Sequence, residues 1–135
     1  SEPKALRLHT PKPFTDSTTV GAQNALTVIP LSSKSILYYH GEWQEALASK
    51  AWSITSWSVS GGIGDVIREK KAALASKKKG DGKELMLLIK PGNETSYQDL
   101  VNLLDEVLIN DISRYAITDI TEEERQFIAT NGALF

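Results

Sequence analysis

A short apolar run between two amphipathic patterns constrains the fold of this chain more than any other feature. Five consecutive apolar residues, 85–89, lie between Glu84 and Lys90, and Pro91-Gly92 follows them. Because the run lacks polar alternation and stops at a turn signal, it predicts a strand in the centre of a sheet or buried on both faces.

Apolar residues at helical spacing flank this strand on both sides. Before it, the pattern predicts an amphipathic helix with the apolar positions Ile63, Val66, Ile67 and Leu74. After it, the pattern predicts a helix over 95–110 with the positions Tyr97, Leu100, Val101, Leu104, Val107 and Leu108. The second helix has a capping signal, since Thr95 or Ser96 precedes Gln98 or Asp99 by three residues.

Three further strands and a terminal helix complete the expected fold. Residues 25–31 and 36–40 predict a hairpin, 114–120 a last strand, and 122–128 a short helix that Thr121 opens. The order predicts an α+β fold with a small mixed sheet of four to five strands and two main helices packed on one face. The step from 84 to 120 is expected to be a right-handed parallel crossover.

Composition divides the chain into a linker and one domain. A length of 135 residues suits a single folding unit. Residues 1–24 are rich in Pro, Thr, Ser and Lys, which predicts a flexible linker, and 25–135 form the expected domain. Residues 42–60 hold three tryptophans without a sustained period, which favours a surface insertion over a core element.

Charge and composition exclude several classes of function. The net charge of -2 gives no general basis for a nucleic-acid partner. The absence of cysteine excludes disulfides, thiol nucleophiles and thiolate metal sites. No window approaches the roughly 18 apolar residues of a spanning helix. Because the chain opens at Ser1 without an initiator Met, we expect that a preceding segment is missing.

No group of residues predicts a catalytic or metal site. His9 and His40 are the only histidines and are 31 positions apart. The Gly-rich stretch 58–64 lacks the spacing of a phosphate loop, which favours a plain loop entering the first helix. Asp105 and Glu106 are adjacent, so their side chains point about 100° apart on a helix. We therefore expect no enzyme activity, no cofactor and no bound metal.

Two surface features each leave two interpretations open. The cluster 77–79 of three lysines complements a helix dipole, and clustered lysines also attract anionic wall polymer or lipid. Trp43, Trp52 and Trp57 either form a packed satellite cluster or a face that binds a partner.

The second half of the chain resembles the ExbD/TolR family. The resemblance is carried by 85–91, by the run TSYQDLVNLLDEVLIN over 95–110, and by RYAITDI over 114–120. These runs are similar to those of ExbD-like proteins of the Bacteroides lineage. Upstream, 35–41 looks like the second strand of that domain and 66–71 like its first helix. The pattern contains no catalytic motif.

The resemblance implies a non-enzymatic part of an inner-membrane machine. Family members have one transmembrane helix with a proton-responsive Asp, a linker and a periplasmic domain, and two copies sit within a pentameric channel. For this chain it implies a single-pass inner-membrane protein whose membrane helix lies outside the 135 residues. The implied partners are an ExbB-like channel subunit, a TonB-like protein and a second copy. The alternative is a TolR-like component that binds peptidoglycan, and a motility stator is a third possibility.

We expect partners to add an extended strand to an open edge of the sheet. The last strand is the predicted edge, with the partner-binding residues Tyr115, Ala116, Ile117 and Thr118. Within the linker, 5–9 alternates apolar and polar residues, so Leu6 and Leu8 can make the same kind of contact in a second copy.

Overall fold

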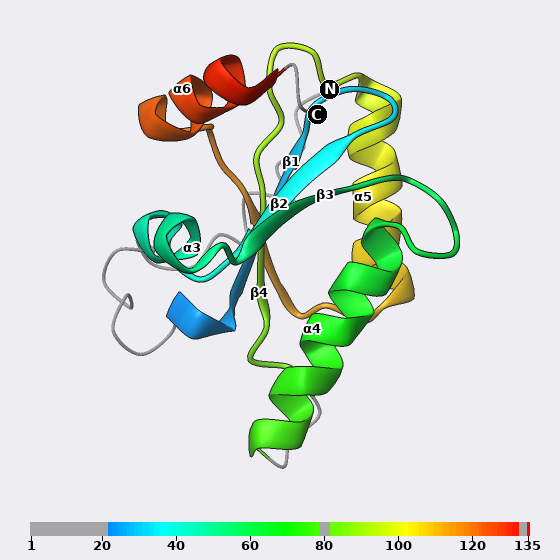
Figure 1. The fold of residues 1–135 in the computed structure, drawn as a ribbon. Helices are drawn as coiled ribbons and strands as arrows, with labels where there is room; N and C mark the ends of the chain where they lie inside the picture. Colours follow the sequence, from blue (N-terminus) through cyan, green and yellow to red (C-terminus); the bar gives the residue numbers. More distant parts are fainter. Residues whose placement is uncertain (1–21, 79–81, 133–134) are drawn as a thin grey trace.

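One mixed five-stranded sheet organises the molecule in the computed structural model, which describes residues 22–78, 82–132 and 135. The strand order is β3-β2-β1-β4-β5, and Figure 1 labels the first four of these strands. Strands β1, β2 and β3 pair antiparallel, whereas β4 pairs parallel with both β1 and β5. The strand bounds are β1 Ala25–Pro30, β2 Ile36–His40, β3 Trp52–Thr55, β4 Met86–Ile89 and β5 Arg114–Ile117.

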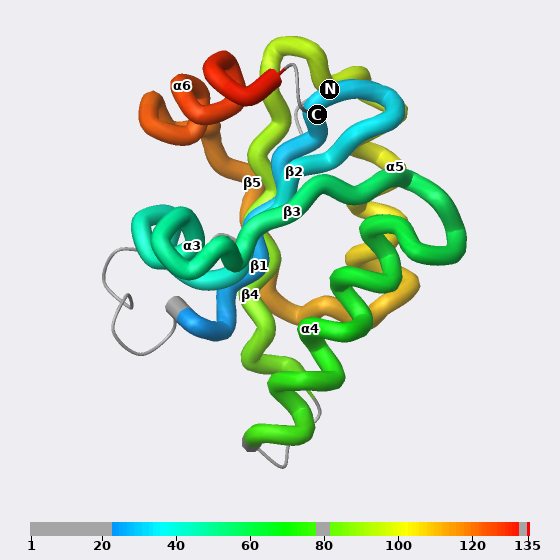
Figure 2. Tube along the Cα trace, viewed as in Figure 1, coloured from blue at the N-terminus to red at the C-terminus, as the bar shows by residue number. Residues whose placement is uncertain are grey.

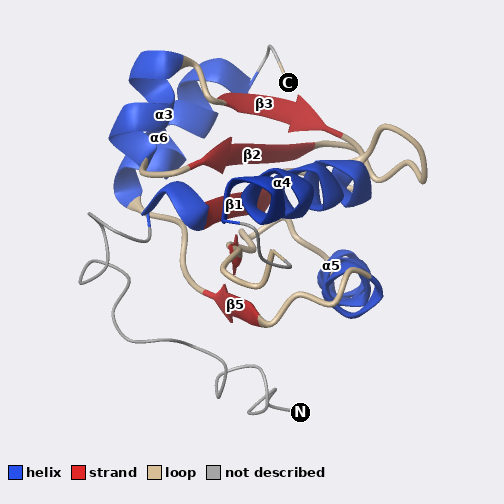
Figure 3. Ribbon diagram, turned by 90° about the horizontal axis from the view of Figure 1, so that it is seen from below, coloured by secondary structure: helices blue, strands red, loops and turns tan. Residues whose placement is uncertain are grey.

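Helices cover both faces of this sheet (Figure 3). The predicted pair, α4 (Ile63–Lys78) and α5 (Tyr97–Ile109), packs on one face, which confirms the expected α+β architecture. On the other face lie α3 (Trp43–Ser49) and α6 (Glu122–Asn131), and a short 3-10 helix, η2 (Ala22–Asn24), precedes β1. The helical layer of α3 and α6 was not predicted from the sequence.

Strands β1 and β4 are buried along their whole length, and for β4 the continuous apolar run predicted this burial. Alternate residues face opposite sides of the sheet, so Val28 and Leu87 pack under α4 and α5 while Ile29 and Leu88 face the other side. The residues of α4 and α5 that complete the first core include Ile63, Ile67, Leu74, Leu103 and Val107.

Local capping sets the start of two helices. Ser96, one of the two candidates, caps α5, because its hydroxyl accepts a hydrogen bond from Asp99 N at 3.0 Å. Thr121 opens α6 with a capping box, in which its hydroxyl accepts from Glu124 N and Glu124 accepts from Thr121 N. Both boundaries agree with the sequence prediction to within two residues.

The structure differs from the expectation for residues 42–60, which form α3 and the edge strand β3 rather than a surface insertion. Ala46 of α3 is only 1% exposed, and Ile54 pairs with Leu37 of β2. Seven helical and four strand residues are too few to sustain a visible period. The linker strand predicted at 5–9, with Leu6, Leu8 and His9, lies outside the described residues.

Candidate functional site

Strand β5 occupies one open edge of the sheet, as predicted (Figure 2). Thr118 N donates to Ile89 O at 3.0 Å, which sets the direction of the alternating backbone groups. The N–H groups of Ala116 and Thr118 therefore face β4, whereas the N–H and C=O of Ile117 point away from it. A partner strand would thus pair through the odd-numbered residues of β5.

This alternation corrects the roles of the predicted edge residues. Ala116 and Thr118 belong to the inner ladder, so a proline at either position would damage the sheet itself rather than only the open edge. Tyr115 and Ile117 pack under the α4 and α5 layer, and Ala116 is buried on the opposite face. Burial raises the pKa of the Tyr115 phenol above its ordinary value.

Strand β3 forms the second edge, which the sequence interpretation missed. His40 N donates to Ala51 O at 3.0 Å, so the backbone groups of Trp52 and Ile54 point away from β2. Within the described residues, no further strand pairs with the outer side of β3 or of β5. The alternation of Trp52 and Ile54 with Ser53 and Thr55 was the available signal, although it is only four residues long.

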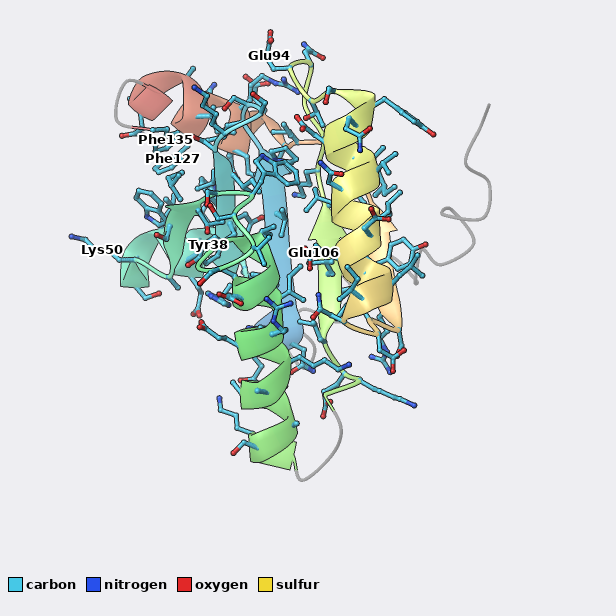
Figure 4. The ribbon with its side chains drawn as sticks, turned by 90° about the vertical axis from the view of Figure 1, so that its right-hand side faces the viewer. Tyr38, Lys50, Glu94, Glu106, Phe127 and Phe135 are labelled. Carbon is cyan, nitrogen blue, oxygen red and sulfur yellow. The ribbon has the colours of Figure 1, made fainter. Side chains whose placement is uncertain are left out.

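The three tryptophans do not form a common surface. Trp43 and Trp52 each lie edge-on to Phe127 of α6, with ring centroids 5.1 Å apart in both pairs. Phe135 adds to this cluster next to Phe127 (Figure 4). Trp57 packs on the opposite core instead, and its Nε1 donates to Ser32 O at 3.4 Å. The packed-cluster interpretation therefore fits Trp43 and Trp52.

A buried polar cluster ties α6 to the sheet. Lys90 Nζ donates to both carboxylate oxygens of Glu124, at 3.0 and 2.8 Å, and the Tyr39 hydroxyl donates to the same carboxylate. Burial first, and then the hydrogen bond and charge of Glu124, raise the pKa of Tyr39 well above its ordinary value. The phenol thus stays protonated and serves as a donor. The sequence analysis predicted the short helix over 122–128 but not this contact.

A cleft of about 290 Å³ opens beside this cluster, between α3, α6 and the sheet. Its lining includes Tyr39, Trp43, Leu88, Lys90 and Glu123. The ammonium of Lys90 and the carboxylate of Glu124 neutralise each other, so the cluster presents neither an activated nucleophile nor an unpaired base to the cleft.

The candidate metal and phosphate features have local structural explanations. No group of three or more His, Asp or Glu in the described part of the chain could hold a metal ion. His40 is half-buried, and burial followed by the charge of Lys70 lowers its pKa. In the Gly-rich loop, Gly61 N donates to the Asp65 carboxylate at 2.6 Å, so the chain itself occupies the position of an anion. This agrees with a plain loop entering α4.

Among the described residues, no helix has both the length and the apolar composition needed to cross a membrane. A scan against models of protein families, a search of curated proteins and a search of solved structures each found no match.

Proposed function

We propose that this chain is the periplasmic domain of an ExbD-like inner-membrane protein. Together with an ExbB-like proton channel and a TonB-like protein, it couples the proton motive force to active transport across the outer membrane. In this role the domain is a docking module rather than an enzyme. An extended segment of the TonB-like protein adds to the open edge of β5.

The support is that the residues carrying the family resemblance form one continuous unit that ends in an edge strand. The run 85–91 contains β4, the run 95–110 contains α5, and the run 114–120 contains β5. Strand β5 pairs with β4, which is buried along its whole length. A strand added beside β5 would share a load along its length among several main-chain hydrogen bonds.

Disulfide trapping in the full-length protein tests this docking, because the 135 residues contain no cysteine of their own. Single cysteines are placed at Thr118, beside the β5 edge, and at Ser53 on the β3 edge as the matched control. Cysteines are then scanned along the periplasmic part of the TonB-like partner. We expect Thr118→Cys to trap the partner at alternate positions and Ser53→Cys to trap none. Trapping at Ser53 alone, or at neither position, would contradict the proposal.

A deletion strain separates import from envelope maintenance. We expect loss of the gene to abolish growth on a nutrient that enters only through TonB-dependent transporters, with unchanged detergent resistance. Unchanged growth on that nutrient with reduced detergent resistance would support the TolR-like alternative, if purified peptidoglycan also retained the 135-residue chain. Dimerisation through Leu6 and Leu8 stays a prediction, which sedimentation of a chain lacking residues 1–12 would test.

A further inference from the structure

Helix α5 carries a second apolar face in addition to the one it buries. Four large apolar side chains are strongly exposed among the described residues, and three of them belong to α5. Tyr97 is 82% exposed, Leu108 78% and Ile109 69%, whereas Leu103 and Val107 on the inner face are buried. The fold therefore accounts for only one of the two apolar faces of this helix.

Two of these exposed residues, Tyr97 and Leu108, belong to a regular stripe along the helix, whereas Ile109 lies about 100° further round the helix. Positions 97, 101, 104 and 108 follow the spacing of four, three and four residues that places side chains on one helical face. We call Tyr97, Val101, Leu104 and Leu108 the outer stripe. At about 1.5 Å per residue the stripe is roughly 16 Å long, or three helical turns. Its two ends are exposed, whereas Val101 is partly buried and Leu104 packs in part against the core under α5.

The segment that carries the outer stripe is acidic, although Lys71 of α4 reaches its carboxyl end and donates to Asn110 O at 2.7 Å and to Asp111 O at 3.0 Å. Residues 91–113 contain five carboxylates and no lysine or arginine, so all 15 basic residues of the chain lie elsewhere. Glu94, Asp105 and Asp111 are exposed, and Glu94 lies in the turn before the amino end of α5 (Figure 4). Glu106 instead lies on the side towards α4, against Gly64. An apolar stripe with an acidic border is complementary to an apolar stripe with a basic border.

We propose that the outer stripe is the docking surface for an amphipathic helix of another protein, one whose apolar face is bordered by Lys and Arg. A helix is the fitting partner because the backbone of α5 is already hydrogen-bonded within the helix and offers no groups to a strand. Side chains three and four residues apart form ridges that pack into the grooves of a second helix. This contact is separate from strand addition at β5 and does not depend on it.

Charge argues against two other occupants, and burial argues against a third. A second copy that paired its own outer stripe would place Glu94, Asp105 and Asp111 near their equivalents. The basic helix α4 cannot substitute, because its apolar residues Ile63 and Ile67 are buried in the core. An anionic lipid surface would repel the same acidic border.

Fluorescence anisotropy with a matched pair of synthetic peptides tests the proposal on the 135-residue chain. Both peptides are 18-residue labelled helices with leucine on one face, and the border residues are Lys in one and Glu in the other. We expect the Lys peptide to bind, with an affinity that falls as salt rises, and the Glu peptide not to bind. Tyr97→Ser and Leu108→Ser should each weaken binding by about five- to tenfold, as truncation of interface anchors does.

Two further variants serve as controls, and two further assays check whether a second copy or a lipid vesicle occupies the outer stripe instead. Val59→Ser is the matched control, because Val59 is 93% exposed but lies outside α5. Asp105→Lys should weaken binding of the Lys peptide, while the circular dichroism spectrum of the protein should stay unchanged. Equal binding by Leu108→Ser and Val59→Ser, or equal binding of both peptides, would overturn the proposal. The proposal would also be overturned if the 135-residue chain associated with itself or bound lipid vesicles, and if Leu108→Ser abolished that association or binding. Trapping at Thr118 should be unchanged by Leu108→Ser, so failure of either proposal is distinguishable from failure of the other.

Discussion

Replacing Lys90 with methionine tests whether the buried ion pair determines how firmly α6 is held. The two side chains are 9% and 1% exposed, and Lys90 Nζ lies 2.8 Å from Glu124 Oε2. Lys90→Met keeps the apolar length of the side chain but leaves the buried Glu124 carboxylate without its cation. Within the described part of the chain, the carboxylate then retains its bonds from the Tyr39 hydroxyl and from Thr121 N.

The expected loss follows from the burial of the pair. Removing one partner of a buried ion pair typically costs about 3–5 kcal/mol, because the remaining charge is desolvated and uncompensated. The two remaining hydrogen bonds and the buried Met side chain place the expected loss near the lower limit, at about 3 kcal/mol. That is a large part of the roughly 5–15 kcal/mol by which a domain is stable. With a urea m-value of about 2 kcal/mol/M, the midpoint should fall by roughly 1.5 M.

Urea unfolding followed by tryptophan fluorescence measures this change, because Trp43 and Trp52 both pack on α6 through Phe127. Arg125→Met is the matched control, since it removes a cation from the exposed pair with Glu122, whose N and O atoms are 3.8 Å apart. Exposed pairs contribute about 0–1 kcal/mol. Lys90→Met combined with Glu124→Gln should be more stable than Lys90→Met alone, because the amide carries no unpaired charge.

Two results would refute this reasoning. A loss for Lys90→Met no larger than that for Arg125→Met would mean that the buried pair contributes little to stability. A double variant that is no more stable than Lys90→Met would mean that lost packing, rather than the unpaired charge of Glu124, causes the effect.

The remaining predictions concern a cap, a histidine and a glycine. Ser96→Ala should lower the unfolding free energy by about 1 kcal/mol, because Asp99 N loses its acceptor, and an unchanged urea midpoint would contradict this. Because burial lowers the pKa of His40, the unfolded chain binds more protons below pH about 6.5, so stability should fall as pH falls. His40→Gln should reduce that fall between pH 7 and 5 in urea titrations. Gly82→Ala should lower the melting temperature, since Gly82 has φ +81 and a Cβ there would lie 2.7 Å from Lys71 O.

The parts of the fold that were predictable depend on patterns contained in one short stretch. The apolar run of β4 and the stripe of α4 are visible because burial selects side chains at the period of the element itself. The same holds for the caps at Ser96 and Thr121, whose partners lie three residues away. The predicted stripe of α5 located the helix, but two of its six positions, Tyr97 and Leu108, are exposed rather than buried. The sequence predicted that β5 lies at a sheet edge. The register with β4 was needed to tell which backbone groups of β5 are open to a partner.

By itself, the sequence determined the order of the long elements, the α+β class and the chemical character of each face. Only the tertiary structure decided that α3 and α6 form a second layer, that Trp43 and Trp52 meet Phe127, and that Tyr97 and Leu108 of α5 stay exposed. It also decided that Lys90 and Glu124 pair, although 34 positions separate them. Contacts of this kind join residues that leave no shared local period, because their proximity is created by the strand order and by helix packing rather than by the spacing along the chain.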